Sequence, residues 1–374
     1  MKIGIPKERR EGERRVAASP ETIKRYKAIG LEPVVERGAG QGAAIPDDAF
    51  AAAGAILADT AAVWQSDIVL KVQRPIDEEM GFLRQGQILI GALDPYMNKD
   101  QVEAYARAGI SAFAMELLPR TTRAQAMDVL SSQANLAGYK ALVDAMAEYP
   151  RVLPMMMTAA GTVTPAKVFI VGAGVAGLQA IATAKRMGAV VTATDVRPAA
   201  KEEIESLGGK FVGFIPEGAA TKGGYARPLT PEEQKKQQEI VAEHLRAQDI
   251  VVTTAQVPGR KAPRIITAAM VAGMKPGSIL FDMAAESGGN IEGAEPGKTV
   301  ETENGVKIIG AKNLVSRIAP AATVLYAKNL LNFLQLLIDP KTKELKVDTQ
   351  DELIKGTLLT QSGSVVHDAF KPAA

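Results

Sequence analysis

KVFIVGAGVAGL, residues 167–178, is the most informative stretch of this chain. Its first five residues form a compact apolar run, which is typical of a buried parallel strand. Gly172, Gly174 and Gly177 follow at G-x-G-x-x-G spacing, and the alanine-rich segment 178–187 then predicts a helix. In such a unit the first glycine permits a tight turn, the second lets the backbone approach a pyrophosphate, and the third lets helix and strand pack closely.

A second strand is predicted at 189–194, and it ends in an acid, Asp195. An acid at this place accepts hydrogen bonds from a ribose 2′-OH and repels a 2′-phosphate. The free N–H groups at the start of the helix form an anion site together with the helix dipole. Strand, glycines, helix, strand and acid in this order predict a dinucleotide site, with NAD(H) as the cofactor. The alternative is that the glycines serve only helix–strand packing.

Composition limits the classes of protein that the chain can belong to. Its 374 residues suggest two domains, and 47% hydrophobic with 23% charged residues are typical of a soluble globular protein. The absence of cysteine excludes disulfides and thiolate chemistry, and a net charge of +2 without a basic stripe argues against nucleic acid as a partner. No 18-residue apolar run or signal peptide is found, so we expect a cytoplasmic chain without direct membrane insertion.

Only two histidines are present, His244 and His367. His244 lies in a charged helical segment, 232–248, and is expected on its solvated face. His367 lies near the C-terminus without an acidic or hydroxyl cluster nearby in sequence. We therefore expect no metal site.

Before residue 120, short apolar runs alternate with helical segments, which predicts a doubly wound parallel sheet. The runs expected to be strands are 2–5, 32–36, 67–72, 87–90 and 110–115. The helices expected between them are 20–28, 47–53, 59–65 and 99–108. Strands expected after the glycine unit are 249–253, 278–281 and 306–309.

Two long helices, expected at 124–148 and 320–337, would join two domains. The first carries mostly small apolar residues spread round its axis, which suits burial between domains. We therefore expect an α/β fold of two doubly wound Rossmann-like domains, joined by long helices with a cleft between them. The N-terminal domain would comprise 1–125 and 320–374, and the NAD(H)-binding domain would comprise 126–319 with the linking helices.

Residues 213–230, GFIPEGAATKGGYARPLT, are rich in glycine and proline and have no regular period. Loops of this length inside compact domains are usually lids or binding loops. Tyr225, which follows two glycines, is the residue that such a lid would use for contact. A passive surface insertion is the alternative.

An unusually polar segment links the first half of the chain to the long helix. Arg120, Gln125, Asp128 and Ser131 gather at the end of a predicted strand and in the first turns of that helix. Ligands of α/β proteins bind at the carboxyl ends of strands. Arginine and aspartate there would hold a nicotinamide carboxamide and ribose, and the glutamine would contact a second ligand. A helix cap with a solvated salt bridge is the alternative.

Two further cations, Arg15 and Lys71, are expected at strand ends. Together they would bind a carboxylate substrate. The alternative is structural pairing with acids such as Glu8 and Glu13.

Several of these segments resemble the alanine dehydrogenase/transhydrogenase family. They include IGIPKE at 3–8, KVQRP at 71–75 and the glycine unit. Within the family, RTTRAQAMDVLSSQAN at 120–135 and PMMMTAAGT at 154–162 are similar to the NAD(H)-binding component. This component is domain I, the soluble part of the alpha subunit, of Re/Si-specific, proton-translocating NAD(P)+ transhydrogenase. The resemblance covers nearly the whole chain.

One departure separates the two branches of the family. Alanine dehydrogenases carry a catalytic histidine in the segment after the lysine block, where this chain has LIGALD at 89–94. Chemistry on pyruvate and ammonia needs proton transfer at the substrate. Direct hydride transfer between two nicotinamides needs juxtaposed rings and exclusion of water. The missing imidazole therefore favours transhydrogenase.

The resemblance also implies roles for individual residues. Arg120, Asp128 and Ser131 would orient the nicotinamide and its ribose, and Gln125 would reach toward the ring of NADP(H) on a partner subunit. The residues implied to hold NAD(H) are Gly172, Gly174, Val175, Ala176, Gly177, Asp195, Val196, Arg197, Tyr225 and Gln256.

The partners implied are a second copy of the chain in a homodimer, an NADP(H)-binding beta subunit or domain III, and the membrane domain II subunits. These partners would hold the cytoplasmic chain at the periphery of the inner membrane. Two other functions stay open. One is an alanine dehydrogenase-like or opine-type NAD-dependent dehydrogenase that uses Arg15 and Lys71 on a keto acid. The other is a non-catalytic NAD-binding module.

Overall fold

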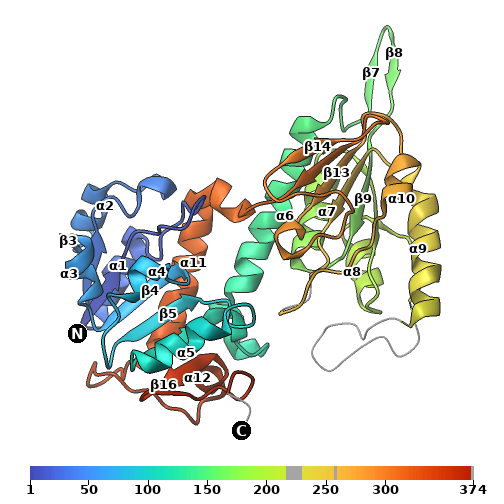
Figure 1. Ribbon diagram of the computed structural model, residues 1–374. Helices are drawn as coiled ribbons and strands as arrows, with labels where there is room; N and C mark the ends of the chain where they lie inside the picture. The colour runs from blue at the N-terminus through green and yellow to red at the C-terminus, as the bar shows by residue number, and fades with distance from the viewer. Residues whose placement is uncertain (216–229, 257–258, 372–374) are drawn as a thin grey trace. The chain divides into compact units, whose positions relative to one another are not determined.

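The computed structural model describes residues 1–215, 230–256 and 259–371 (Figure 1). The chain forms two compact units, each an α/β structure with one large sheet. Unit 1 comprises Met1–Gln133 and Val315–Ala374, and unit 2 comprises Ala134–Leu314. The first boundary therefore lies inside helix α6 (Val129–Glu148).

The sheet of unit 1 has the strand order β17-β16-β6-β5-β4-β1-β2-β3. Strands β1 to β6 pair in parallel, and β16 and β17 extend the sheet as antiparallel strands beyond β6. The strands are β1 (Lys2–Ile5), β2 (Glu32–Glu36), β3 (Ile56–Ala58), β4 (Ile68–Gln73), β5 (Ile88–Ala92), β6 (Ser111–Ala114), β16 (Leu358–Gln361) and β17 (Ser364–Val365).

Helices cover both faces of this sheet. One face packs on α1 and α11, through side chains such as Ile23 and Phe333, and the other packs on α3 and α5, through Trp64 and Tyr105. The helices are α1 (Pro20–Ala28), α2 (Asp47–Ala52), α3 (Thr60–Trp64), α4 (Asp77–Met80), α5 (Lys99–Arg107), α11 (Ala319–Leu334) and α12 (Glu352–Thr357). Short 3₁₀ helices are η1 (Gln41–Ala43), η2 (Met115–Leu117), η3 (Thr122–Met127), η5 (Leu314–Ile318) and η6 (Gln335–Leu337).

The sheet of unit 2 has the order β11-β10-β9-β12-β13-β15-β14 and is parallel except for β14 at its edge. Its strand order reverses beside β9, which is the switch point where α/β sheets bind ligands. The strands are β9 (Lys167–Val171), β10 (Val190–Thr194), β11 (Lys210–Phe211), β12 (Ile250–Thr253), β13 (Ile279–Asp282), β14 (Thr299–Glu301) and β15 (Lys307–Gly310).

Strand β9 shows why this sheet is covered on both faces. Val168 and Ile170 pack against α6, α7 and α8, whereas Phe169 and Val171 pack against α9 and α10. Successive side chains of a strand point to opposite faces, so an uninterrupted apolar run fits a doubly covered strand. The helices are α7 (Val175–Arg186), α8 (Ala200–Ser206), α9 (Pro231–Leu245) and α10 (Ala268–Ala272), with η4 (Ala285–Ser287).

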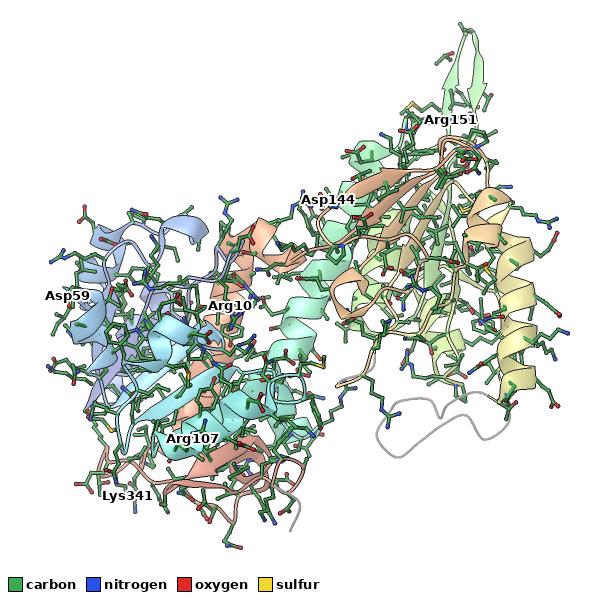
Figure 2. The ribbon with its side chains drawn as sticks, in the orientation of Figure 1. Arg10, Asp59, Arg107, Asp144, Arg151 and Lys341 are labelled. Carbon is green, nitrogen blue, oxygen red and sulfur yellow. The ribbon has the colours of Figure 1, made fainter. Side chains whose placement is uncertain are left out.

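A two-stranded hairpin, β7 (Met156–Thr158) and β8 (Gly161–Val163), projects from the rest of unit 2 (Figure 1). Figure 2 shows Arg151 near its base. Every residue of both strands is exposed, and Met157 has 76% of its surface accessible. An exposed apolar patch of this kind marks an interaction surface.

The predicted α/β class with two Rossmann-like parallel sheets is confirmed, and most predicted elements begin and end within a residue or two of the observed ones. The helix predicted at 178–187 begins earlier, at Val175. The helix predicted from Ala124 is wrong at its start. It begins at Val129, because Asp128 is extended and its carboxylate accepts a hydrogen bond from the N–H of Ser131. The last three residues predicted for the second long helix form η6 instead.

Helix α6 contacts the start of α7 at Gly138. A Cβ at this position would lie 2.0 Å from the carbonyl oxygen of Ala176, so alanine cannot occupy it without movement of one helix. The glycine therefore sets the distance between α6 and the first turn of α7.

This contact predicts the sign of a stability change. Helix propensity alone would make Gly138→Ala stabilising by about 1 kcal/mol. We expect it instead to lower the free energy of unfolding by about 1–3 kcal/mol, because the added methyl group overpacks the contact. Urea denaturation measures the change. Gly273→Ala, at the end of α10, is the control, since its Cβ would meet nothing closer than 3.5 Å. Equal stability of the two variants would contradict this explanation.

Candidate functional site

The glycine loop of unit 2 is built around a close approach between two backbones. A Cβ on Gly177 would lie 1.9 Å from the carbonyl oxygen of Gly172, so only glycine fits in this first turn of α7. Gly172 has a φ of 99°, in the region that favours glycine. Its carbonyl also accepts a hydrogen bond from the hydroxyl of Thr254 at 3.0 Å, which ties the turn to the end of β12.

The second glycine is different, because a Cβ on Gly174 would meet nothing within 4 Å. Gly174 is the N-cap of α7 and makes no side-chain capping bond, so the first N–H groups of the helix, at Val175 and Ala176, receive no cap from it. Open space beside uncapped N–H groups fits the pyrophosphate of a dinucleotide, which the helix dipole also favours.

Asp195 follows β10 directly and lies beside the glycine loop. Its Oδ2 accepts a hydrogen bond from the N–H of Ala173 at 2.7 Å, and its Oδ1 accepts one from the N–H of Arg197 at 2.8 Å. The carboxylate is therefore fixed by two backbone donors at the place where a ribose would lie. The guanidinium of Arg197 contacts the same carboxylate at 3.2 and 3.4 Å and donates to the carbonyl of Ala173 at 2.8 Å.

Two buried polar residues at the same edge of the sheet were not predicted from the sequence. Asn290 donates to the carbonyl of Ala255 at 2.8 Å and accepts from its N–H at 3.1 Å. Asp282, at the end of β13, accepts from the N–H of Ile291 at 2.8 Å. Burial raises the pKa of Asp282, although these hydrogen bonds oppose the shift. Both residues follow a central strand or the loop beside it, and that position was the available signal.

These contacts support the segment that carries the last predicted ligand of unit 2. Gln256 is exposed, and its Nε2 donates to the carbonyl of Met283 at 3.2 Å. Val196 lies between Asp195 and Arg197 in the same turn. Tyr225 and most of the predicted lid, 213–230, lie outside the described residues.

The polar segment 120–131 belongs to unit 1, where helix α11 anchors it. Asn329 and Asn332 both donate to the carbonyl of Ala126, at 2.9 and 2.8 Å, and Met127 is buried in the core. Gln125, in contrast, is exposed. The anchored backbone therefore presents this glutamine to solvent.

Asp128 and Ser131 form one hydrogen-bonded group. Asp128 accepts from the backbone N–H of Ser131 at 2.9 Å and from its hydroxyl at 2.5 Å. Asp128 thus caps α6, as the structural alternative predicted. Arg120 is exposed, and the neighbouring Arg123 forms an ion pair with Asp351. A carboxylate has about four acceptor positions, so capping leaves room for a ligand.

The two cations proposed to bind a carboxylate substrate are both paired. Lys71 is 1% exposed and lies 3.1 Å from Glu8 and 2.9 Å from Glu79. Arg15 donates to both carboxylate oxygens of Glu13, at 2.8 and 2.7 Å. Burial raises the pKa of Glu8, and Lys71 opposes that shift. The structural pairing that the sequence left open is what the structure contains.

The prediction that His244 lies on a solvated helix face is wrong. The side chain is half-buried, its Nε2 lies 2.8 Å from the hydroxyl of Thr192, and its ring meets the edge of Phe169 at 4.8 Å. Burial lowers the pKa of this imidazole. The helix face packs on the sheet, and the charged residues around His244 in sequence hid this contact.

Across the described parts of the chain, no three or more acidic, histidine or cysteine side chains are grouped so that they could bind a metal ion. Among these residues, no helix combines the length and the apolar character needed to cross a bilayer.

Two family models match the chain, and they divide it inside α6, as the two units do. Residues 4–137 match the model described as Alanine dehydrogenase/PNT, N-terminal domain, and residues 141–368 match Alanine dehydrogenase/PNT, C-terminal domain. The chain belongs to the alanine dehydrogenase/PNT family.

Among the family's curated members, the first of the separate polypeptides named as NAD(P) transhydrogenase subunit alpha in Rhodospirillum rubrum is 54% identical over 380 aligned residues, which cover 99% of each protein. The crystal structure of transhydrogenase from Sinorhizobium meliloti has a TM-score of 0.89 and 53% identity, and the match covers 98% of this chain and 100% of that one. The structure titled L-alanine dehydrogenase has a TM-score of 0.82 and 25% identity, with 99% and 98% covered. The relatives thus include both branches of the family.

The glycine loop predicts different outcomes for two similar substitutions. Gly177→Ala should destabilise unit 2, because its Cβ overlaps the carbonyl of Gly172. Gly174→Ala should keep its stability and weaken NADH binding roughly ten- to a hundredfold, because the methyl group fills the space next to the N–H groups and removes about one charged hydrogen bond.

Thermal unfolding and a fluorescence titration with NADH separate the two effects. Gly174→Ala that binds NADH like the unmodified chain would show that the anion does not lie at the start of α7.

Proposed function

We propose that this chain is the NAD(H)-binding subunit of a proton-translocating NAD(P)+ transhydrogenase. Its nucleotide would exchange a hydride directly with NADP(H) bound on a partner subunit, and the membrane subunits would couple this exchange to proton movement. The observation that carries the proposal is the glycine loop beside Asp195, since uncapped N–H groups and a fixed carboxylate match the two polar parts of an NAD adenosine half. The similarity to transhydrogenase alpha subunits supports it.

Asp195 supports NAD(H) rather than NADP(H) as the resident nucleotide. Its carboxylate has only 10% of its side-chain surface exposed and is held by two backbone donors, so it stays at the edge of the loop. There it can accept hydrogen bonds from ribose hydroxyls, whereas a 2′-phosphate would meet a like charge. Gly172, Gly174 and Gly177 would leave room for the pyrophosphate.

At the nicotinamide end we assign the polar segment of unit 1. Arg120, Asp128 and Ser131 would orient the nicotinamide ribose and carboxamide, and Gln125 would contact the second nicotinamide ring. The anchoring of this segment by Asn329 and Asn332 supports the assignment, because alignment of two rings needs a rigid support. NADH bound here would supply a hydride from its nicotinamide ring.

This transfer asks for no proton acceptor from the chain, and the residues present agree with that. An enzyme that reduces a keto acid needs cations that are available to its carboxylate, but Arg15 and Lys71 are both neutralised by buried acids. The histidine that alanine dehydrogenases carry after the lysine block is absent at 89–94. Alanine dehydrogenase activity is therefore the second candidate rather than the first.

The partners proposed are a second copy of the chain, an NADP(H)-binding beta subunit and the membrane subunits. The exposed hairpin supports the homodimer, since Met155, Met156, Met157 and Val163 are all at least 44% exposed and together form an apolar patch that a second copy would cover. Binding to the membrane subunits would place the chain at the inner membrane through its partners.

The proposal is tested with Gln125→Asn in the full chain, mixed with an NADP(H)-binding transhydrogenase subunit. Shortening this exposed side chain should disturb ring alignment without touching the adenosine end. A misplacement of about 1 Å costs roughly a hundredfold in rate. We therefore expect stopped-flow hydride transfer to slow by about that factor, with the dissociation constant of NADH nearly unchanged.

Gln65→Asn is the control, because Gln65 is also an exposed glutamine of unit 1 but caps α3. It should transfer hydride at the unmodified rate. Equal rates in Gln125→Asn and Gln65→Asn would contradict the role of Gln125. Alanine-dependent reduction of NAD+ by the chain alone would favour the second candidate instead.

A further inference from the structure

The turn after β10 contains both an acid and a base that could meet the 2′ position of an adenosine ribose. Asp195 suits the hydroxyl of NAD(H), whereas an arginine near this place is what accommodates the 2′-phosphate of NADP(H) in other Rossmann proteins. Arg197 lies two residues from Asp195 and has 24% of its side chain exposed. The loop therefore needs a reason why Arg197 does not recruit the phosphorylated nucleotide.

Arg197 contacts two acids from different elements. Its Nε lies 3.2 Å from Asp195 Oδ1, and its Nη2 lies 3.4 Å from the Oε2 of Glu203, in the first turn of α8. The same Nη2 donates to the carbonyl of Ala173 at 2.8 Å. Asp195 and Glu203 together carry two negative charges against one positive charge, so the group as a whole opposes a phosphate.

The bonds to Asp195 are unequal in length. The backbone donors lie at 2.7 and 2.8 Å, whereas the guanidinium nitrogens lie at 3.2 and 3.4 Å. These four contacts take up the roughly four acceptor positions of a carboxylate. Ribose hydroxyls that bind Asp195 must replace the longer contacts, and the displaced guanidinium then needs another partner.

We propose that Glu203 is a specificity-determining residue, which holds Arg197 when ribose hydroxyls take its place on Asp195 and so keeps the guanidinium away from a 2′-phosphate. This inference rests on the proposed NAD(H) site. Glu203 itself is 39% exposed and touches no part of the glycine loop other than through Arg197 among the described contacts. Its effect would come from where it keeps the arginine.

The test is Glu203→Gln in the full chain, with dissociation constants for NADH and NADPH measured by fluorescence titration. Removal of the carboxylate frees Arg197 for the phosphate, so the preference for NADH should fall. An exposed ion pair is worth about 0.2–1 kcal/mol, which corresponds to a change of about 1.5- to fivefold. High salt should reduce the difference, because the contacts are partly exposed.

Glu202→Gln is the matched control, since Glu202 lies in the same first turn of α8 with the same charge but is exposed and has no ion pair with Arg197. It should leave the NADH/NADPH preference unchanged. In the double variant Glu203→Gln with Arg197→Ala, the gain in NADPH affinity should disappear, because it acts through the guanidinium.

The outcomes separate this inference from the proposed function. If the unmodified chain binds no NADH, the proposed site itself fails. If the chain binds NADH and Glu203→Gln changes the preference no more than Glu202→Gln, only the role of Glu203 is overturned. A gain in NADPH affinity that survives Arg197→Ala would also overturn it.

Discussion

The close approach of Gly177 to the carbonyl of Gly172 is the constraint on which the proposed site depends. With no room for a Cβ there, the first turn of α7 lies directly against the end of β9, and its N–H groups point to the carboxyl edge of the sheet. Gly138 adds a second contact of this kind from α6, and Thr254 ties the turn to β12. Three elements thus fix one short backbone segment, so the anion site costs no rearrangement when it is filled.

Around this segment the polar groups divide into those that support the loop and those that remain for a ligand. Asp282 and Asn290 are fully occupied with backbone groups at the ends of β12 and β13. Asp195 is held by the backbone on one side and by Arg197 on the other. The same division recurs in unit 1, where Asp128 caps a helix and Gln125 faces solvent. Buried acids also neutralise Arg15 and Lys71, which leaves the chain suited to binding a nucleotide rather than to acid–base chemistry.

The sequence predicted the parallel sheets well, because buried parallel strands are continuous apolar runs and the glycine spacing has one physical meaning. It predicted the start of α6 poorly, since Ala124 and Met127 are apolar and continue the helical pattern, while Asp128 ends it by capping. The strands β16 and β17 were missed because they are short and pair across the chain with β6, which no local pattern reveals. His244 and Asn290 were misjudged or missed for a similar reason, since their contacts come from distant segments.

The central claim is that the start of α7 binds the pyrophosphate of NAD(H), and backbone amide chemical shifts test it most directly. The full chain is titrated with NADH, with ADP and with adenosine, which lacks phosphate. We expect NADH and ADP to shift the amide signals of Gly174, Val175 and Ala176 strongly, and adenosine to shift them much less. Large shifts elsewhere with these three amides unchanged would contradict the claim.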